Sequence, residues 1–282
     1  PVLTHVAVGA NAAWVSSVDS GTAGDVGSPG LLWRIDPRTN QRSGPLALGA
    51  GIDGLALVAG SIWVVDGESL RRINPVTGKV QATVRGVAAG QIVAGGGALW
   101  AGRQRIELPT LDVRPVDLPA GAVISAAGPA GVWAAGDALY RLDPRNGRVV
   151  AHVARPGFRP VALAESKSSL WVAYSSRTER ELTSLVRVDP RTNRLVGRAI
   201  DLRGHLPAAA AVADGAVWLL TYNQEEAGAL LWQIDPASGR LVGHALRLTK
   251  GTPFLLAAGA HTLWIGEDLD LGTVTRVDLG PR

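Results

Sequence analysis

The chain has 282 residues, 46% of them hydrophobic and 18% charged, with 35 Gly and 17 Pro, which is typical of a folded protein rich in turns and excludes a disordered chain. It has no Cys, which excludes a disulfide framework, a thiolate metal site and a thiol nucleophile, and no apolar run approaches the ~18–20 residues that span a bilayer. The formal net charge is +4 and the basic residues are spread along the chain, a distribution that argues against nucleic-acid binding.

One segment recurs along the whole chain. In each copy an apolar stretch is followed by Gly, a small residue, an aliphatic residue and then Trp. The copies are centred on Trp14, Trp63, Trp100, Trp133, Trp171, Trp218 and Trp264. Their spacings, between 33 and 49 residues, agree with propeller blades of ~40–50 residues, some of them shortened. The repeat therefore predicts an all-β fold, a seven-bladed β-propeller of four-stranded antiparallel blades, as one domain over residues 1–282.

A second signal follows each Trp. A variable loop leads to an apolar strand that ends in Asp-Pro or Asn-Pro, most clearly in residues 32–37, 71–75, 139–144, 185–190 and 231–236. Asp or Asn before Pro starts a type I turn, because the side-chain oxygen caps the backbone and Pro fixes φ. Residues that tolerate positive φ are expected to close these turns: Asn40, Gly78, Gly147, Asn193 and Gly239. Each copy then contains four strands, A to D, with the Trp on strand B.

Two copies depart from the pattern. The third has Leu108-Pro109-Thr110 at its turn, so its last hairpin is expected to be less regular. The seventh ends after strand C. Pro1 to Thr4 are predicted to supply its missing outer strand, and the alternative is a three-stranded blade. The seven Trp side chains are expected to pack between neighbouring blades.

The sequence contains no Met, even at its first position. We therefore expect a fragment of a longer chain, from which a signal peptide or membrane anchor has been removed. Membrane association is expected only through such a missing anchor.

The pattern Leu-Trp-Val…Arg-Ile-Asp-Pro-x-Thr-Asn/Gly resembles the YVTN/YncE-like propeller repeats, and is also similar to the virginiamycin B lyase-like propellers. The resemblance covers nearly the whole chain, but its motifs are structural, so it implies a fold more strongly than a function. Such propellers include secreted binding proteins, extracellular sensor domains and a few lyases, which implies an extracytoplasmic or secreted location. The WD dipeptide of WD40 repeats is absent.

Function is expected on one face of the propeller. The B–C loops and D–A connections share that face, whereas the A–B and C–D turns lie on the other. The C–D turns are uniform, but the B–C loops in residues 16–30, 175–184, 222–229 and 267–272 are long and unlike one another. Departures from a repeat often mark function, so we expect an asymmetric site nearer blades five, six, seven and one.

Polar residues at the end of strand B, or in the D–A connections, are the candidates for this site. They are Asp53, Asp66, Gln91, Arg103, Arg159, Tyr174, His205, Tyr222 and Glu267. Their mixture of carboxylates, cations, amide and phenol suits a polar ligand with both donors and acceptors. The competing interpretation is that such residues only solvate the rim of the channel.

Metal and cofactor signals are weak. The five His show no metal-ligand spacing. The pair Glu225–Glu226 and the group Glu267, Asp268 and Asp270 can supply oxygen ligands to a hard cation, but such runs are more often solvated loops. We therefore predict neither a metal nor a cofactor.

The leading hypothesis is a monomeric, non-catalytic binding or sensing module for a small polar ligand or a protein partner. Two alternatives remain. The resemblance to the lyases implies a metal-dependent enzyme, with His205 as base and Glu267 as metal-linked acid. The third hypothesis is a structural platform for protein interactions.

Overall fold

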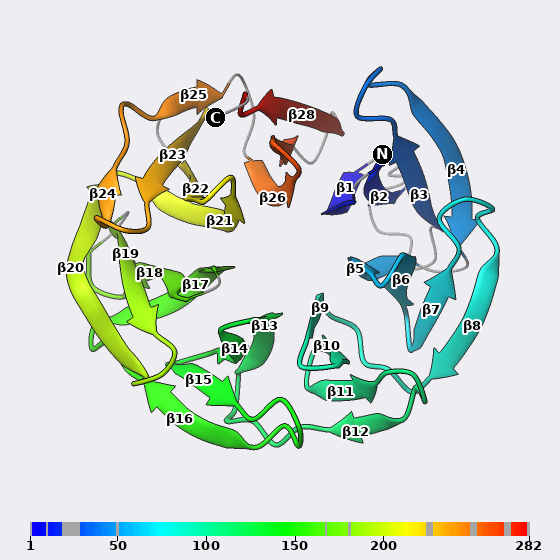
Figure 1. The fold of residues 1–282 in the computed structure, drawn as a ribbon, viewed down its shortest axis with the longest axis horizontal. Coiled ribbons are helices and arrows are strands. Elements are labelled where there is room, and N and C mark those ends of the chain that lie inside the picture. Colours follow the sequence, from blue (N-terminus) through cyan, green and yellow to red (C-terminus); the bar gives the residue numbers. More distant parts are fainter. Residues whose placement is uncertain are drawn as a thin grey trace.

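The computed structural model describes residues 2–9, 11–18, 29–48, 51–166, 168–179, 182–223, 228–248, 253–267 and 272–280. These residues form seven antiparallel sheets arranged radially around a central axis (Figure 1). The described residues include no helix, and hence none long and apolar enough to cross a membrane. The predicted seven-bladed propeller is confirmed.

The strands run from the channel outwards in each blade, so we keep the letters A to D for them (Figure 1). The first four blades comprise β1 (Val2–Val8), β2 (Ala13–Val18), β3 (Gly30–Ile35) and β4 (Arg42–Leu48); β5 (Ile52–Val58), β6 (Ser61–Asp66), β7 (Ser69–Ile73) and β8 (Val80–Arg85); β9 (Ile92–Gly95), β10 (Ala98–Ala101), β11 (Gln104–Glu107) and β12 (Val113–Pro115); and β13 (Val123–Gly128), β14 (Gly131–Ala135), β15 (Leu139–Leu142) and β16 (Val149–Val153). The last three comprise β17 (Phe158–Glu165), β18 (Leu170–Ser176), β19 (Leu182–Asp189) and β20 (Arg194–Arg203); β21 (Leu206–Ala213), β22 (Ala216–Tyr222), β23 (Ala229–Asp235), β24 (Arg240–Leu241) and β25 (Leu246–Leu248); and β26 (Pro253–Gly259), β27 (Thr262–Glu267) and β28 (Thr273–Asp278).

The two last blades differ from the other five. In blade six the outer strand is interrupted, because β24 and β25 pair separately with β23. Blade seven consists of three strands among the described residues. The prediction that Pro1 to Thr4 complete it is wrong for the described part of that segment. Leu3 is buried and pairs with Ser17, so residues from Val2 onwards belong to the inner strand of blade one.

The core lies between the blades. Strand B is the most buried strand, and all six residues of β6 are buried. The apolar clusters join neighbouring sheets: Trp63 of blade two shares a cluster with Leu99 and Ile106 of blade three. Trp100 is likewise clustered with Val132 of the next blade. Because a four-stranded sheet has two faces to cover, radial stacking buries both of them, as the Trp pattern predicted.

The Asp-Pro turns have the predicted geometry. Asp36 Oδ1 accepts the N–H of Arg38 at 2.8 Å, and Asn74 Oδ1 accepts that of Val76 at 2.8 Å. Asn40, Gly78, Gly147, Asn193 and Gly239 all have positive φ, between 55° and 73°. The last hairpin of blade three is less regular, as predicted: the Leu108–Pro109 peptide bond in its turn is cis, and its outer strand pairs through three residues. The closing bond is kept, because Leu111 donates to the Glu107 carbonyl at 2.8 Å as Asn40 does to Asp36 at 2.8 Å.

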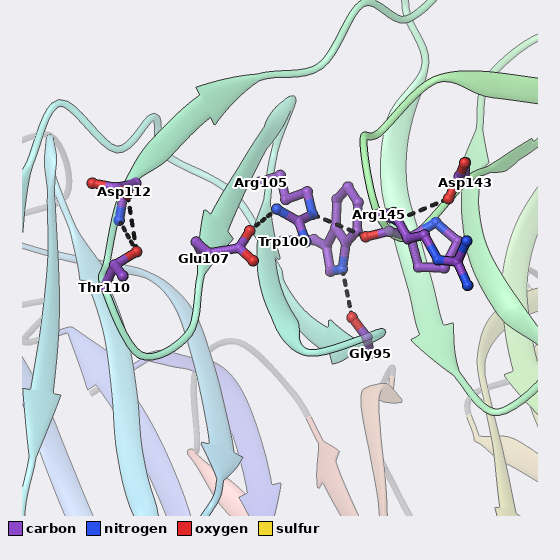
Figure 2. A network of polar contacts seen from close by, with 9 residues as sticks. Gly95, Trp100, Arg105, Glu107, Thr110, Asp112, Asp143 and Arg145 are labelled. Atoms are coloured by element: carbon purple, nitrogen blue, oxygen red, sulfur yellow. Dashed lines mark hydrogen bonds and ion pairs between the residues drawn. The ribbon is translucent and has the colours of Figure 1, made fainter.

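The Arg that recurs on strand C links each blade to the next. Arg105 extends along the Trp100 ring, 5.6 Å from its centroid, and donates to the Pro144 carbonyl in the turn of blade four at 3.0 Å (Figure 2). Arg187 reaches Pro236 in the same way at 3.2 Å. Arg276 of blade seven donates to the Pro37 carbonyl of blade one. The repeated Trp, Arg and Asp-Pro are therefore parts of one interblade contact.

Candidate functional site

The two faces of the ring are built differently. We call the face with the D–A connections and B–C loops the mouth face, and the face with the A–B and C–D turns the turn face. On the turn face the same Arg and Asp-Pro hydrogen bonds recur from blade to blade. Variation between blades is concentrated on the mouth face.

A β-bulge interrupts the inner strand of six blades near the mouth. In blade one the register passes from Leu3–Ser17 directly to His5–Ser16, which leaves Thr4 as the extra residue. The extra residues are Thr4, Asp53, Ser125, Val161, Ala208 and Phe254. In blade three Gln91, directly before β9, holds the corresponding place. A bulge re-aims a side chain, and bulges are over-represented next to functional sites.

All of these residues except Asp53 line a cavity of about 320 Å³ in the mouth half of the channel, which we call the throat. It is lined by Thr4, His5, Val6, Leu55, Gln91, Ser125, Val161, Ala162, Leu163, Ala208, Ala209, Ala210, Phe254, Leu255 and Leu256. The hydroxyl and amide groups come from blades one, three and four. Every lining side chain from blades five, six and seven is apolar, so the side chains form a polar arc and an apolar arc, although the exposed lining as a whole is more polar than apolar.

Three larger grooves, of about 550 to 610 Å³, open elsewhere between blades. One is lined by Arg141, Arg187 and Pro190, another by Trp14, Arg34 and Pro75. Because these are the residues of the repeated interblade contact, the grooves follow from the scaffold itself. The throat is lined by residues that differ from blade to blade, so we take it as the candidate site.

One titratable side chain lines the throat. The Nδ1 atom of His5 lies 3.3 Å from the Ser16 hydroxyl, which in turn is 2.7 Å from that of Thr4. Burial lowers the pKa of His5, although the neighbouring Asp53 carboxylate opposes the change. The imidazole is therefore neutral at pH 7. Asp53 itself accepts the Gly67 N–H at 3.1 Å, on the mouth side of β6.

Behind the throat, the mouth ends of the B strands carry buried polar groups. Asp66 is 3% exposed and lies beside Arg71, whose Nε is 2.9 Å from Oδ2 and donates to Oδ1 at 3.1 Å. Burial raises the pKa of Asp66, and Arg71 opposes part of that rise. In blades one and six the same place is a hydroxyl that accepts an indole N–H at 2.9 Å, from Trp33 to Ser17 and from Trp232 to Thr221.

In blades five and seven an oxygen of the polar group at this position lacks a hydrogen-bond partner among the described residues. Tyr174 is 1% exposed, and its hydroxyl has no hydrogen-bond partner among the described residues. Burial raises its pKa to about 12, although Arg155 opposes the rise. The Arg155 guanidinium lies over the Phe158 ring, 3.8 Å from its centroid. In blade seven Glu267 is 5% exposed, and its Oε1 also lacks a partner within the described chain.

The other predicted residues are dispersed. Arg103 donates to the carbonyls of Leu118, Pro119 and Ala122, so it holds the connection that leads into blade four. His205, between blades five and six, meets Trp232 edge-on with ring centroids 5.6 Å apart.

Arg159 on β17 is exposed, and Tyr222 at the end of β22 is half-buried. Of the nine candidates, Gln91 lines the throat and Asp53 occupies its bulge ring. Contact of any of the nine with a ligand stays a prediction.

Within the described residues, no group of three or more His, Asp or Glu is placed to hold a metal ion. Both acidic groups considered from the sequence lie partly or wholly outside the residues that the structure describes. Glu225, Glu226, Asp268 and Asp270 lie outside the described residues. The cation-binding interpretation therefore stays untested.

Sequence reasoning missed most of the bulge ring. Thr4, Asp53, Val161, Ala208 and Phe254 each stand ten residues before their repeat Trp. That constant offset, combined with unlike side chains, is a signal that the sequence did contain. Gln91 and Ser125 stand nine and eight residues before theirs, because Gln91 precedes a strand without a bulge and the bulge of blade four lies nearer its Trp.

No model of a known protein family matches this chain, and no curated protein sequence matches it. Similar solved structures exist. The Pan2 WD40 domain of Neurospora crassa has a TM-score of 0.74 at 11% identity, over 100% of this chain and 90% of that one. A chain of a mitotic checkpoint complex has a TM-score of 0.75 at 11% identity, covering 99% and 87%. The Cps50 (Swd1) propeller of Myceliophteria thermophila has a TM-score of 0.70 at 15% identity, covering 99% and 97%. These similarities establish the propeller fold, and the finer resemblance to YVTN/YncE-like or virginiamycin B lyase-like repeats stays a prediction.

Proposed function

We propose that this protein is a non-catalytic binding module whose ligand or partner is engaged on the mouth face, at the throat. The observation that carries the proposal is the bulge ring. Five blades use a bulge at the same register to present a side chain at the same place, and blade four has its bulge two pairs further along, yet those side chains are unlike one another. A scaffold alone has no need to vary a position whose backbone geometry is so constant.

Buried polar groups around the throat support this proposal. Leaving a buried hydroxyl or carboxylate oxygen without a partner costs about 1–3 kcal/mol. Tyr174 and Glu267 both carry such an oxygen within the described chain, and both stand at the mouth ends of their strands. Groups that cost stability without a partner are typical of sites that meet a ligand or ordered water.

A thermal-shift screen tests the proposal, with saccharides, amino acids, nucleotides and short peptides as the panel. A ligand that binds only the folded state adds about 2.7 kcal/mol of stability at a hundredfold excess over its Kd. We expect any compound that raises the melting temperature to lose that effect in Gln91→Ala. It should keep the effect in Arg191→Ala, an exposed substitution on the turn face. Hits that respond only to the turn-face variant would contradict the proposal.

A protein-docking platform is a second candidate within the same class. An apolar group on the outer edges of blades four to six favours it: Val149, Val150, Leu195, Leu241, Val242 and Leu246 are each 37–56% exposed. One of the similar solved structures is itself a chain of an assembly, the mitotic checkpoint complex. If this edge docks a partner, Val150→Lys should abolish the complex, whereas Gln91→Ala should leave it intact.

We further propose a monomer that works outside the cytoplasm or is secreted. We expect a monomer because each blade of the ring packs against its two neighbours. The proposed location rests on the resemblance to secreted propellers. Sedimentation equilibrium tests the first and fractionation of the source cells tests the second. A concentration-dependent mass would contradict the monomer.

A further inference from the structure

The apolar arc of the throat exposes hydrocarbon surface that the fold has no need to expose. Val161, the bulge residue of blade five, is 40% exposed although it lies on the innermost strand. Ala208 and Phe254 occupy the bulges of the next two blades and are partly exposed. Each square ångström of such surface that a ligand covers is worth about 25 cal/mol. The arc therefore favours a ligand with an apolar face.

The polar arc faces it across the channel. Thr4, Gln91 and Ser125 supply hydroxyl and amide groups that both donate and accept hydrogen bonds. Ser125 donates one hydrogen bond to the Val123 carbonyl at 3.0 Å, which leaves its oxygen able to accept. This arc favours a ligand edge of hydroxyl, carbonyl or amide groups.

The throat carries no formal charge at neutral pH. None of its lining residues is Asp, Glu, Lys or Arg, and its one His is neutral at pH 7. Asp53, the charged member of the bulge ring, is engaged by the Gly67 N–H rather than lining the cavity. An anionic ligand would lose its hydration here without gaining a counter-ion, and the one carboxylate near the throat, Asp53, already accepts a backbone hydrogen bond. The throat therefore selects against anions and offers a cation no lining carboxylate.

The volume limits the size of the ligand. About 320 Å³ is the space of roughly ten water molecules at ~30 Å³ each. That is the lower end of the range for small-molecule sites, ~300–1,000 Å³. A single amino-acid-sized molecule fits within it, whereas a dinucleotide or oligosaccharide would extend beyond it.

We propose that the throat binds a neutral amphipathic small molecule, with its apolar face against Val161, Ala208 and Phe254 and its hydrogen-bonding edge against Thr4, Gln91 and Ser125. This inference rests on the proposed function, and it replaces the polar ligand expected from the sequence by a half-apolar one. Selectivity comes from the division of the ring into two arcs. A purely polar molecule leaves the apolar arc exposed to water. A hydrocarbon leaves the hydrogen-bonding groups of the polar arc without partners.

Isothermal titration calorimetry with two matched probes tests this. N-acetyl-L-leucinamide carries a neutral amide edge and an aliphatic side chain, and N-acetylglycinamide has the same edge without the side chain. At concentrations up to roughly 10 mM, we expect the leucine probe to bind at least about tenfold more tightly. Equal affinities, or no binding of the leucine probe, would overturn the inference.

Matched variants test whether the preference for the leucine probe arises in the throat. Val161→Asp should abolish the preference for the leucine probe, whereas Val76→Asp, the same change at a 90% exposed turn-face residue, should retain it. Val161→Thr is nearly isosteric, and should weaken the leucine probe several-fold with the melting temperature unchanged. A Val76→Asp effect as large as that of Val161→Asp would place the binding elsewhere.

The outcome also separates this inference from the proposed function. If the leucine probe fails but a panel compound binds and is lost in Gln91→Ala, the mouth face binds ligands and the amphipathic inference is wrong. If neither the probes nor the panel bind, both are wrong.

Discussion

Glu165 shows how a single carboxylate ties two blades together on the turn face. It ends the inner strand of blade five, and its Oε1 accepts the N–H groups of Ala130 and Gly131 in the turn of blade four. Its other oxygen is buried without a partner among the described residues. Burial raises the pKa of Glu165 to about 7, and the two amide hydrogen bonds oppose that rise. Burial outweighs the hydrogen bonds, so the folded protein favours the protonated acid.

Stability should therefore fall as pH rises through the range from about 4.5 to about 7. In this window the folded state binds a proton that the unfolded state has released, and the advantage is lost above the folded pKa. Glu165→Gln keeps an acceptor for the two amides and has no charge at any pH. We expect it to be more stable than the parent at pH 8 by about 1–2 kcal/mol, a value reduced for partial exposure.

Urea unfolding at pH 5 and pH 8 measures this difference. Glu179→Gln is the matched control, because Glu179 is exposed and pairs with Arg203 on the surface. The Glu179→Gln variant should show the same pH dependence of the free energy of unfolding as the parent. A Glu165→Gln variant with the same pH dependence as the parent would show that burial does not control this group.

Two buried hydroxyls make a second comparison at the residue scale. Thr183 donates to the His205 carbonyl at 2.7 Å, whereas the Tyr174 hydroxyl has no described partner. Thr183→Val should therefore lower the free energy of unfolding by about 1–2 kcal/mol, and Tyr174→Phe should leave it unchanged or raise it. Equilibrium unfolding of both variants checks this. A large loss in Tyr174→Phe would indicate that the hydroxyl is bonded, for instance to ordered water.

At the scale of elements, the turns were predictable and the bulges were not. Asp36 and Asn40 act through their own backbone within six residues, so the turn can be read from local sequence. A bulge such as that at Val161 depends on register against a partner strand, which is decided by packing. For the same reason the sequence identified Asp53 and Gln91 as candidates but missed Val161 and Phe254, whose apolar side chains carry no chemical signal.

Gly78 tests the turn argument. Its φ is +68°, and a Cβ there would meet nothing nearer than Leu46 at 3.9 Å. Because space is available, Gly78→Ala costs only the backbone strain of the left-handed region, about 1 kcal/mol. Gly78→Asn should cost less, because Asn tolerates this conformation. Thermal unfolding should rank the parent first, Asn second and Ala last, and equal melting temperatures for Ala and Asn would contradict the argument.

For the whole molecule, we expect closure of the ring to be the weakest of the seven interfaces. Six interfaces join blades that are consecutive in the chain, but blades seven and one meet through side chains and strand faces (Figure 1). Arg276 crosses that interface to the Pro37 carbonyl and, at 3.2 Å, to Asn40 Oδ1. Sequence counting predicted closure by the N-terminal residues, but Leu3 is held in blade one because its side chain is buried there.

We expect Arg276→Ala to destabilise the ring more than Arg187→Ala, which removes the equivalent contact between blades five and six. Loss of a charged hydrogen bond costs about 1.5–3 kcal/mol in either place, but only at the closure does it also release an interface without a covalent connection. Proteolysis under native conditions, followed by unfolding in urea, measures both variants. Equal losses would show that the closure has no special role.

The central claim is that the mouth face binds the ligand and that the turn face has a structural role. The indole N–H signals in NMR spectra report on the two faces separately. Trp33 and Trp232 donate to Ser17 and Thr221 towards the mouth, whereas Trp100 and Trp264 donate to Gly95 and Thr262 towards the turns. We would add the panel compound with the largest thermal shift and follow these signals. The account predicts changes at Trp33 or Trp232 with Trp100 and Trp264 unmoved, and changes confined to Trp100 and Trp264 would contradict it.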